Sequence, residues 1–176
     1  DVNGVGPETI MKALSRPEPR QWCRPIILGS LTALEKARRF APDGPDFLAT
    51  DTIEAALSPT DSIPVVDCGY PGPMVQPGVL NPAAGAAAVA WIEAAVRAAQ
   101  TGLIAGMVTC PIHKEGIMKA GCPFTGHTSL IASMTSSPDY RMCLFTDTMR
   151  IVHITAHLSL LDAIASVKKE RILTST

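Results

Sequence analysis

The amino-acid sequence predicts an α/β fold with a largely parallel sheet, and two features of the 176-residue chain carry this prediction. Short apolar runs that suit strands alternate with segments that have helical spacing, as in proteins built from βαβ units. The run GLIAGMVTCP at 102–111 is almost continuously apolar, which is typical of a strand buried on both faces of a sheet.

The first part of the chain supplies the elements of this pattern in order. Pro7 and Glu8 are residue types that the first turn of a helix favours. The apolar runs that follow are short and bounded by turn residues, as strands are. We expect helices at 7–16 and 31–41, and strands at 24–30, 46–49 and 62–68, the last two joined by a loop.

The second part begins with a connection at 68–82 that is rich in proline and glycine. Asn81 and Pro82 suit the N-cap and first turn of an alanine-rich helix at 83–100, which is expected to form despite Gly85. We expect a short helix at 114–121, paired strands within 141–147 and 149–157, and a helix at 160–173 that starts with the capping-box pair Ser159 and Asp162.

Composition excludes several classes of protein. Fifteen basic and sixteen acidic residues give a net charge of −1, so no basic face for nucleic acid is indicated. No apolar run approaches the roughly 18–20 residues that cross a bilayer, and the first residues do not resemble a signal peptide. Five scattered cysteines without CxxC spacing favour a reducing cytoplasm. Both ends are expected to be truncated, so that 1–176 is a portion of a longer protein.

The stretch NGVGPE at 3–8 is the first candidate for binding. It does not match the dinucleotide fingerprint, because Thr9 stands where the third glycine belongs. Its backbone N–H groups could bind an anion or the polar edge of a cofactor at a helix start. The alternative is an ordinary tight turn.

Two further candidates follow the apolar run 102–111. Lys114, with His113 beside it, would place a cation where ligands gather in open α/β sheets, unless both are solvated loop residues. In PFTGHTSLIA, Gly126, His127 and Thr128 could donate several hydrogen bonds to a phosphate or carboxylate at a helix start. The alternative is that Thr128 or the next residue, Ser129, is only the N-cap and that His127 faces water.

His153 and His157 stand four residues apart, a spacing that zinc ligands use on a helix. The surrounding β-branched residues favour a strand instead, on which four residues span about 13 Å, too far for one ion. At the end of that strand His157 is the better placed metal ligand, and His153 is expected to be structural.

Three segments occur in an order that identifies a family resemblance: GVGPETI, TCPIHKEGIMKAGCPFTGHTSLIA and MRIVHITAHLSLLDAI. Together they resemble 4-hydroxythreonine-4-phosphate dehydrogenases, enzymes of pyridoxal phosphate biosynthesis. The resemblance covers essentially the whole chain but only about the N-terminal half of such an enzyme. It implies an isocitrate/isopropylmalate dehydrogenase-like fold, with two domains around a central cleft, of which 1–176 is the N-terminal portion.

The resemblance also implies roles for particular residues. His127 and Thr128 would bind substrate, and Lys114 is the candidate catalytic residue, through contact with the substrate phosphate. His157 would ligate a divalent metal (zinc, magnesium or cobalt), although Ala156 stands where threonine is usual. Two further metal histidines and most contacts to NAD or NADP would lie in the absent C-terminal half. A homodimer that shares the metal site between subunits is implied.

The implied function is NAD-dependent, metal-dependent oxidation of 4-phosphooxy-L-threonine to 2-amino-3-oxo-4-phosphooxybutanoate, which decarboxylates to 3-amino-2-oxopropyl phosphate. Within the family, the alternatives are D-threonate or D-erythronate 4-phosphates and cyclic cis-dihydrodiols as substrates. Outside it, the alternative is a metabolite-binding module without catalysis, against which the retention of His127, Thr128 and His157 argues. A cytoplasmic oxidoreductase with no nucleic-acid or membrane partner is expected.

Overall fold

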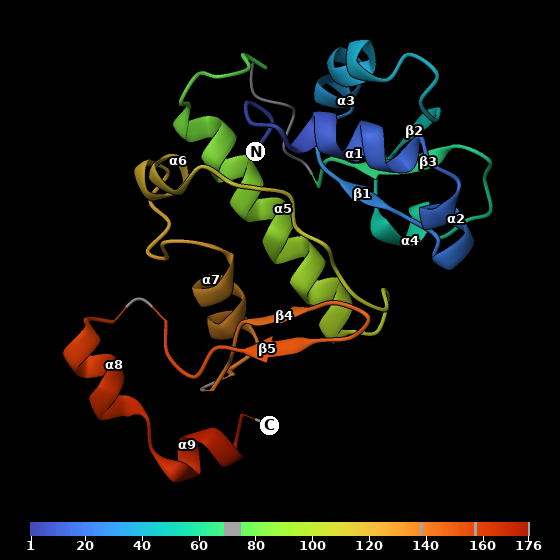
Figure 1. Cartoon of the computed structure of the whole chain (residues 1–176). Coiled ribbons are helices and arrows are strands. Elements are labelled where there is room, and N and C mark those ends of the chain that lie inside the picture. Colours follow the sequence, from blue (N-terminus) through green and yellow to red (C-terminus); the bar gives the residue numbers. More distant parts are fainter. Residues whose placement is uncertain (69–74, 138, 157, 176) are drawn as a thin grey trace. The chain divides into compact units, whose positions relative to one another are not determined.

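The computed structural model describes residues 1–68, 75–137, 139–156 and 158–175 of a chain that divides into two compact units, Asp1–Ser136 and Ser137–Thr176. Figure 1 labels the elements of both. Unit 1 contains α1 (Gly6–Leu14), α2 (Glu18–Trp22), β1 (Ile27–Leu28), α3 (Leu31–Ala37), a 3-10 turn η1 (Arg38–Phe40), β2 (Phe47–Thr50), α4 (Ile53–Ala56), β3 (Ile63–Val66), α5 (Pro82–Gln100), α6 (Lys114–Lys119) and α7 (His127–Met134). Unit 2 contains β4 (Cys143–Phe145), β5 (Arg150–Val152), α8 (Leu160–Ser166) and α9 (Lys169–Leu173).

A three-stranded parallel sheet organises unit 1 and confirms the predicted α/β class. The strand order is β1-β3-β2, with Ile27 opposite Val65 and Phe47 opposite Ile63. All four residues of the central strand β3 are buried, because helices cover both faces of the sheet.

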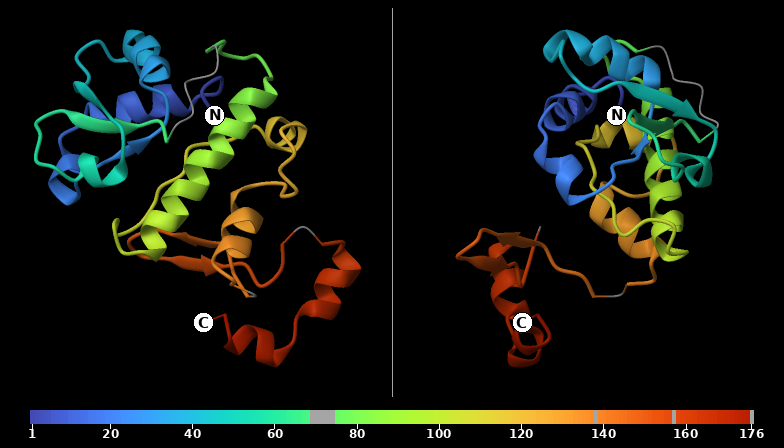
Figure 2. Two further views of the ribbon diagram at one scale, coloured as in Figure 1. Left: turned by 180° about the vertical axis from the view of Figure 1, so that it is seen from behind. Right: turned by 90° about the vertical axis from the view of Figure 1, so that its right-hand side faces the viewer.

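One face of the sheet is covered by α1. Ile10 and Leu14 of this helix pack against Ile27, Ile63 and Val65 of the strands. These side chains share one face because successive residues of a strand point to opposite sides. Figures 1 and 2 show α1 running beside the strands.

The alanine-rich helix α5 covers the other side. Asn81 accepts a hydrogen bond from the Ala83 N–H at 2.8 Å and Pro82 is the first helical residue, as predicted. Ala84, Ala87 and Trp91 form a cluster against which Leu28 of β1 packs. A third side of α5, formed by Ile92 and Val96, packs against Leu130 of α7. The small side chains let neighbouring elements approach this helix from several directions.

The predicted buried strand at 102–111 is wrong in this structure. The segment is a turn followed by extended chain without ladder hydrogen bonds, and Val108 is fully exposed. Met107, together with Ile112 just beyond the segment, packs against the cluster between α5 and α7. The physical reason is that none of the strands within the described residues lies alongside this segment, so its apolar composition finds no sheet in which to be buried.

Two short helices escaped the sequence analysis: α2, and α4 within the loop expected between β2 and β3. Each spans little more than one turn, too few residues for a helical period to be visible. The helix expected at 160–173 is divided into α8 and α9, because Val167 and Lys168 adopt extended backbone conformations. Arg24 hydrogen-bonds the carbonyls of Ala56 and Leu57 at the end of α4.

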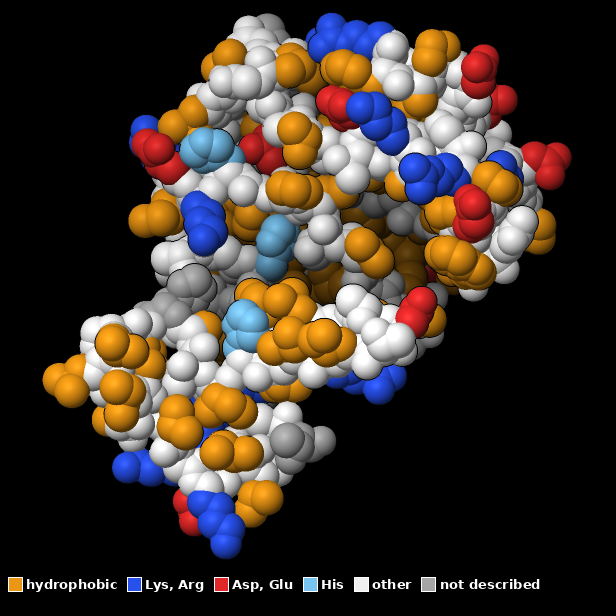
Figure 3. Space-filling view, in the orientation of Figure 1, with side chains coloured by type: hydrophobic (Ala, Val, Ile, Leu, Met, Phe, Trp, Pro, Cys, Tyr) orange, Lys and Arg blue, Asp and Glu red, His pale blue; other side chains and the backbone are white. Residues whose placement is uncertain are grey.

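Unit 2 contains the predicted antiparallel pair, β4 and β5, with Leu144 opposite Ile151. Ser159 caps α8 by accepting a hydrogen bond from the Asp162 N–H at 3.2 Å, as predicted. Many apolar side chains of this unit are exposed, and Figure 3 shows them as hydrophobic surface over its helices. They include Leu144, Phe145, Met149, Leu160, Leu161, Ile164 and Leu173.

Candidate anion-binding site

The glycine turn at the start of the chain lies against the end of the 102–111 segment. The Cys110 thiol donates to the Gly6 carbonyl at 3.8 Å, and a Cβ atom on Gly6 would lie 3.2 Å from the Cβ of Cys110. Glycine therefore permits a close approach at the first residue of α1. This contact brings together two residues that are 104 positions apart in the sequence.

The GHT turn lies beside the same cysteine. Gly126 is the N-cap of α7 and His127 its first residue, so the alternative in which Thr128 or Ser129 is the cap is wrong. The imidazole of His127 hydrogen-bonds the Cys110 backbone. Its Nε2 atom is buried and has no hydrogen-bond partner within the described residues. A buried polar atom without a partner is unfavourable unless a ligand or another chain segment satisfies it.

Burial lowers the pKa of His127 from its ordinary value. The hydrogen bond to the Cys110 backbone raises this pKa, but the effect of burial is larger. His127 is therefore held in its neutral form, in which one ring nitrogen donates and the other accepts a hydrogen bond. Because the ring donates its hydrogen bond to the Cys110 backbone, the unpartnered Nε2 is the acceptor, and a hydroxyl or ammonium group of a ligand would satisfy it.

This pKa shift predicts a pH dependence of stability. Because the pKa of His127 is lower in the folded than in the unfolded protein, its contribution is complete above the unfolded value of about 6.5 and is lost as the pH falls through the folded value. The free energy of unfolding should therefore decrease as the pH falls below about 6.5, and decrease less in His127→Gln. Urea denaturation at several pH values measures both slopes, and equal slopes would contradict the assignment.

Lys114 lies beside the GHT turn. It is the first residue of α6, whose N-cap is His113, with Nδ1 accepting from the Gly116 N–H at 3.2 Å. A Cβ atom on Gly126 would lie 3.9 Å from Cε of Lys114, so the lysine stem passes directly along this glycine. No carboxylate in the described part of the chain forms an ion pair with Lys114. The His113 side chain is used as a helix cap.

Together these groups form a site for an anion. The first N–H groups of α7 have no partner inside the helix, and they carry the positive end of its dipole. Thr128, the second residue of α7, is exposed and adds a hydroxyl next to these N–H groups. With the ammonium of Lys114 alongside, the structure brings together three of the four residues assigned from the sequence: Lys114, His127 and Thr128.

The fourth residue, His157, lies outside the described residues, and its metal-ligand assignment stays a prediction. His153 follows β5 in unit 2, and its backbone N–H donates to the Met142 carbonyl at 2.9 Å, consistent with a structural position. Across the described ranges, no three or more side chains of His, Cys, Asp or Glu gather into a group that could hold a metal ion. The described residues therefore do not form a metal site by themselves.

Asn3 is a residue of this region that sequence reasoning missed. Its buried side chain accepts from the Gln76 N–H and donates to the Val79 carbonyl, both at 2.9 Å. It thereby attaches the glycine turn to the segment that leads into α5. The only signal in the sequence was the NG pair itself, which does not indicate a distant partner.

We expect Asn3→Ala to lower the free energy of unfolding by about 2 kcal/mol, because two backbone groups lose their buried partner. Asn3→Asp keeps the acceptor for Gln76 but loses the donor for Val79, so an intermediate loss is expected. Chemical denaturation of the three proteins tests this order, and an alanine variant as stable as wild type would contradict it.

The fold and this site define a parallel α/β unit with a basic site for a small anionic ligand at a helix start. Residues 21–176 match the family model described as pyridoxal phosphate biosynthetic protein PdxA. The chain therefore belongs to the PdxA family, a family of oxidoreductases that act on phosphorylated hydroxy acids with NAD(P) and a divalent metal.

Individual relatives agree with this assignment. The chain is 34% identical over 168 residues to D-threonate 4-phosphate dehydrogenase of Cupriavidus necator, covering 96% of the chain and 50% of the relative. It is 37% identical over 160 residues to 4-hydroxythreonine-4-phosphate dehydrogenase of Desulfosudis oleivorans, covering 91% and 47%. The crystal structure of a 4-hydroxythreonine-4-phosphate dehydrogenase from Burkholderia phymatum superimposes with a TM-score of 0.87 at 28% identity, covering 99% and 53%. The chain thus spans about half the length of the relatives it matches.

One further structural finding concerns membranes. Among the residues that the structure describes, no helix has the length and apolar composition needed to span a bilayer.

Proposed function

We propose that this chain is the N-terminal portion of an NAD(P)- and metal-dependent dehydrogenase that oxidises 4-phosphooxy-L-threonine. The observation that carries the proposal is the buried, unpartnered Nε2 of His127 at a helix start that Lys114 adjoins. A phosphorylated hydroxy amino acid offers both an anion and hydroxyl or amino groups to such a site. The resemblance of the chain to 4-hydroxythreonine-4-phosphate dehydrogenases over nearly its full length supports this substrate class.

The residues of this chain would bind and orient the substrate. The ammonium of Lys114 and the first N–H groups of α7 attract the phosphate, and the hydroxyl of Thr128 adds a hydrogen bond. His127, held by Cys110, fixes the carbon skeleton at its unpartnered nitrogen.

Oxidation removes a hydride from C3 and a proton from the C3 hydroxyl. NAD(P) supplies the hydride acceptor when it is bound. The product is a β-keto acid, 2-amino-3-oxo-4-phosphooxybutanoate, which loses carbon dioxide to give 3-amino-2-oxopropyl phosphate. No step is assigned to the metal, because the described residues do not form its site.

D-threonate 4-phosphate is the second candidate substrate, because the curated relatives are divided between the two activities. Both substrates carry the phosphate that Lys114 and α7 would bind, so these residues do not discriminate between them. D-erythronate 4-phosphate shares the same property. A cis-dihydrodiol lacks the phosphate, so the cationic site argues against it. A metabolite-binding module would also bind an anion at this site, and turnover distinguishes it from an enzyme.

The assembly and location complete the proposal. The exposed apolar side chains of unit 2, such as Leu160 at 79% exposure, support an interface that a second copy covers in a homodimer. His157 would ligate the divalent metal, with further ligands from residues beyond this chain. All five cysteines are free, which agrees with a cytoplasmic enzyme.

The test is NAD(P)H formation by the intact protein that carries this chain. 4-Phosphooxy-L-threonine, D-threonate 4-phosphate and D-erythronate 4-phosphate are compared with and without added divalent metal, for wild type and His157→Ala. Metal-dependent turnover of the threonine phosphate that the variant loses is the expected result. If the protein prefers D-threonate or D-erythronate 4-phosphate, that compound replaces 4-phosphooxy-L-threonine as the proposed substrate. No turnover of any of them would overturn the proposed function.

A further inference from the structure

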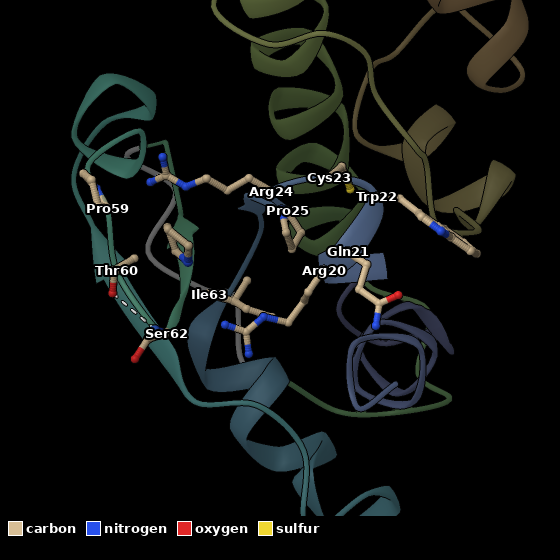
Figure 4. A pocket seen from close by; sticks show the side chains of 11 residues that line it. Arg20, Gln21, Trp22, Cys23, Arg24, Pro25, Pro59, Thr60, Ser62 and Ile63 are labelled. Atoms are coloured by element: carbon tan, nitrogen blue, oxygen red, sulfur yellow. Dashed lines mark hydrogen bonds between the residues drawn. The ribbon is translucent and has the colours of Figure 1, made fainter. Parts of the chain in front are cut away.

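A second cavity, separate from the candidate site, opens beside the sheet of unit 1. It has a volume of about 430 Å³ and lies between α2 and the segments that precede β1 and β3. Since β1 and β3 are parallel, it lies at the amino ends of these strands. It shares no lining residue with the site around His127. Figure 4 shows its side chains, with those of Arg20 and Arg24 extending toward the chain around Pro59, Thr60 and Ser62.

The charged side chains that line this cavity are all positive. Arg20 and Arg24 are among its lining residues, and no Asp or Glu is. Across the described ranges neither arginine forms an ion pair with a carboxylate. Two guanidinium groups on one hollow repel each other unless an anion or solvent compensates them. The cavity is therefore electrostatically suited to an anionic ligand.

Backbone hydrogen bonds hold both guanidinium groups in place. Arg20 donates to the Asp61 carbonyl at 2.6 Å. Arg24 donates to the Leu57 carbonyl at 2.6 Å and to those of Ala56 and Ser58, at the end of α4. A guanidinium carries five N–H donors. Arg20 uses one of them here and keeps a paired edge, whereas Arg24 uses both hydrogens of Nη2 and one of Nη1 and keeps single donors at Nη1 and Nε. Both guanidinium groups are thus fixed beside the cavity before any ligand binds, and no carboxylate of the described residues is paired with them.

The remaining walls match a small polar molecule that carries an anion. Thr60 and Ser62 add polar surface to the lining, and the Ser62 N–H donates to the Thr60 hydroxyl at 3.2 Å (Figure 4). Pro25 and Ile63 supply apolar surface between the arginines. The volume exceeds the roughly 30 Å³ that one water occupies in the liquid by more than tenfold, so the cavity can hold more than a bare ion.

We propose that this cavity binds the phosphate group of a small phosphate monoester between Arg20 and Arg24. The guanidinium of Arg20 can bind two phosphate oxygens through its remaining pair of N–H donors, and Arg24 adds a positive charge and single N–H donors. The inference does not rest on the proposed function, because none of these residues belongs to the candidate site. It adds a second ligand site at the edge of the sheet opposite to the one where α/β proteins usually bind their substrates.

The experiment separates the two sites. Binding of inorganic phosphate and of glycerol 3-phosphate is measured by titration calorimetry in the double variant Lys114→Gln/His127→Asn, which removes the ammonium and the imidazole of the first site. Arg20→Gln is then added to this background. The matched control is Arg16→Gln, which removes the same charge from an exposed arginine that does not line the cavity.

Glycerol 3-phosphate should bind to the double variant, and adding Arg20→Gln should weaken this binding about tenfold or more, whereas adding Arg16→Gln leaves it unchanged. Arg24→Lys, which keeps the charge but loses the hydrogen bonds that hold this side chain beside the cavity, should weaken it as well. If inorganic phosphate binds and glycerol 3-phosphate does not, the monoester assignment is overturned. Equal loss in the Arg16 and Arg20 variants, or no binding to the double variant, would overturn the cavity as a site.

Discussion

Replacing His127 with asparagine is expected to weaken binding of 4-phosphooxy-L-threonine about 10- to 100-fold. The physical reason is that the imidazole holds a buried nitrogen ready for the ligand, and a hydrogen bond that involves a charged group contributes about 1.5–3 kcal/mol. Asparagine is a shorter side chain and does not place a polar atom at the position of Nε2. The dissociation constants of the two proteins, measured by titration calorimetry, give the ratio directly.

The matched control is His113→Asn. His113 caps α6 through Nδ1, and asparagine is a favoured N-cap residue, so this variant should keep the helix start and the affinity. The two variants make the same chemical change, 14 residues apart in the sequence. If both lose affinity equally, the effect is due to folding, and His127 has no special role in binding.

Gly85→Ala is expected to lower the free energy of unfolding by about 3 kcal/mol, although alanine normally favours a helix by about 1 kcal/mol. A Cβ atom at this position would lie 2.4 Å from the carbonyl oxygen of Gly116 and 2.9 Å from the Ile117 nitrogen. Both are backbone atoms of α6, so no side chain can move aside. The helix that begins with Lys114 would have to shift away from α5. Thermal or urea denaturation measures the loss.

Gly106→Ala is the control for this substitution. A Cβ atom on Gly106 would meet nothing within 4 Å, and its backbone does not need a positive φ. This variant should be as stable as wild type or slightly more stable, because alanine restricts the unfolded chain. The Gly85 variant should also bind phosphate ligands less tightly, since Lys114 moves with α6. Equal stability of the two variants would contradict the close approach of the helices.

Local signals in the sequence predicted the elements whose ends are set by neighbouring residues. Asn81 and Pro82 start α5, and Ser159 starts α8, as their residue types indicated. The apolar runs at 27–28, 47–50 and 63–66 form the parallel sheet as expected. The helix starts depend on hydrogen bonds within a few residues, and the strands were recognised as short apolar runs bounded by turn residues, both of which a sequence displays directly.

The errors arose where the outcome depends on distant partners. The segment 102–111 has the composition of a buried strand, but a strand requires a neighbour for its backbone hydrogen bonds, and the described chain does not offer one. The separation of α8 from α9 depends on two extended residues, Val167 and Lys168, whose types are compatible with a helix. Composition alone could not distinguish these cases.

For the candidate site, too, the sequence indicated some features and only the structure showed the others. The residue types at Lys114, His127 and Thr128, together with the family resemblance, indicate the chemistry of an anion-binding site. The sequence could not show that Cys110 holds the imidazole, that Nε2 is buried without a partner, or that Gly126 and not Thr128 caps α7. Those facts determine whether His127 is a ligand-binding group or a solvated side chain.

By itself, then, the sequence determined the α/β class, most helix starts, the family and the residues that we propose for the site. The tertiary structure alone decided which of these residues meet, that Gly85 is required by the backbone of α6, and that Arg20 and Arg24 line one cavity. The reason is physical: capping and periodicity are short-range effects along the chain, whereas burial, desolvation and close packing are set by segments that are distant in the sequence.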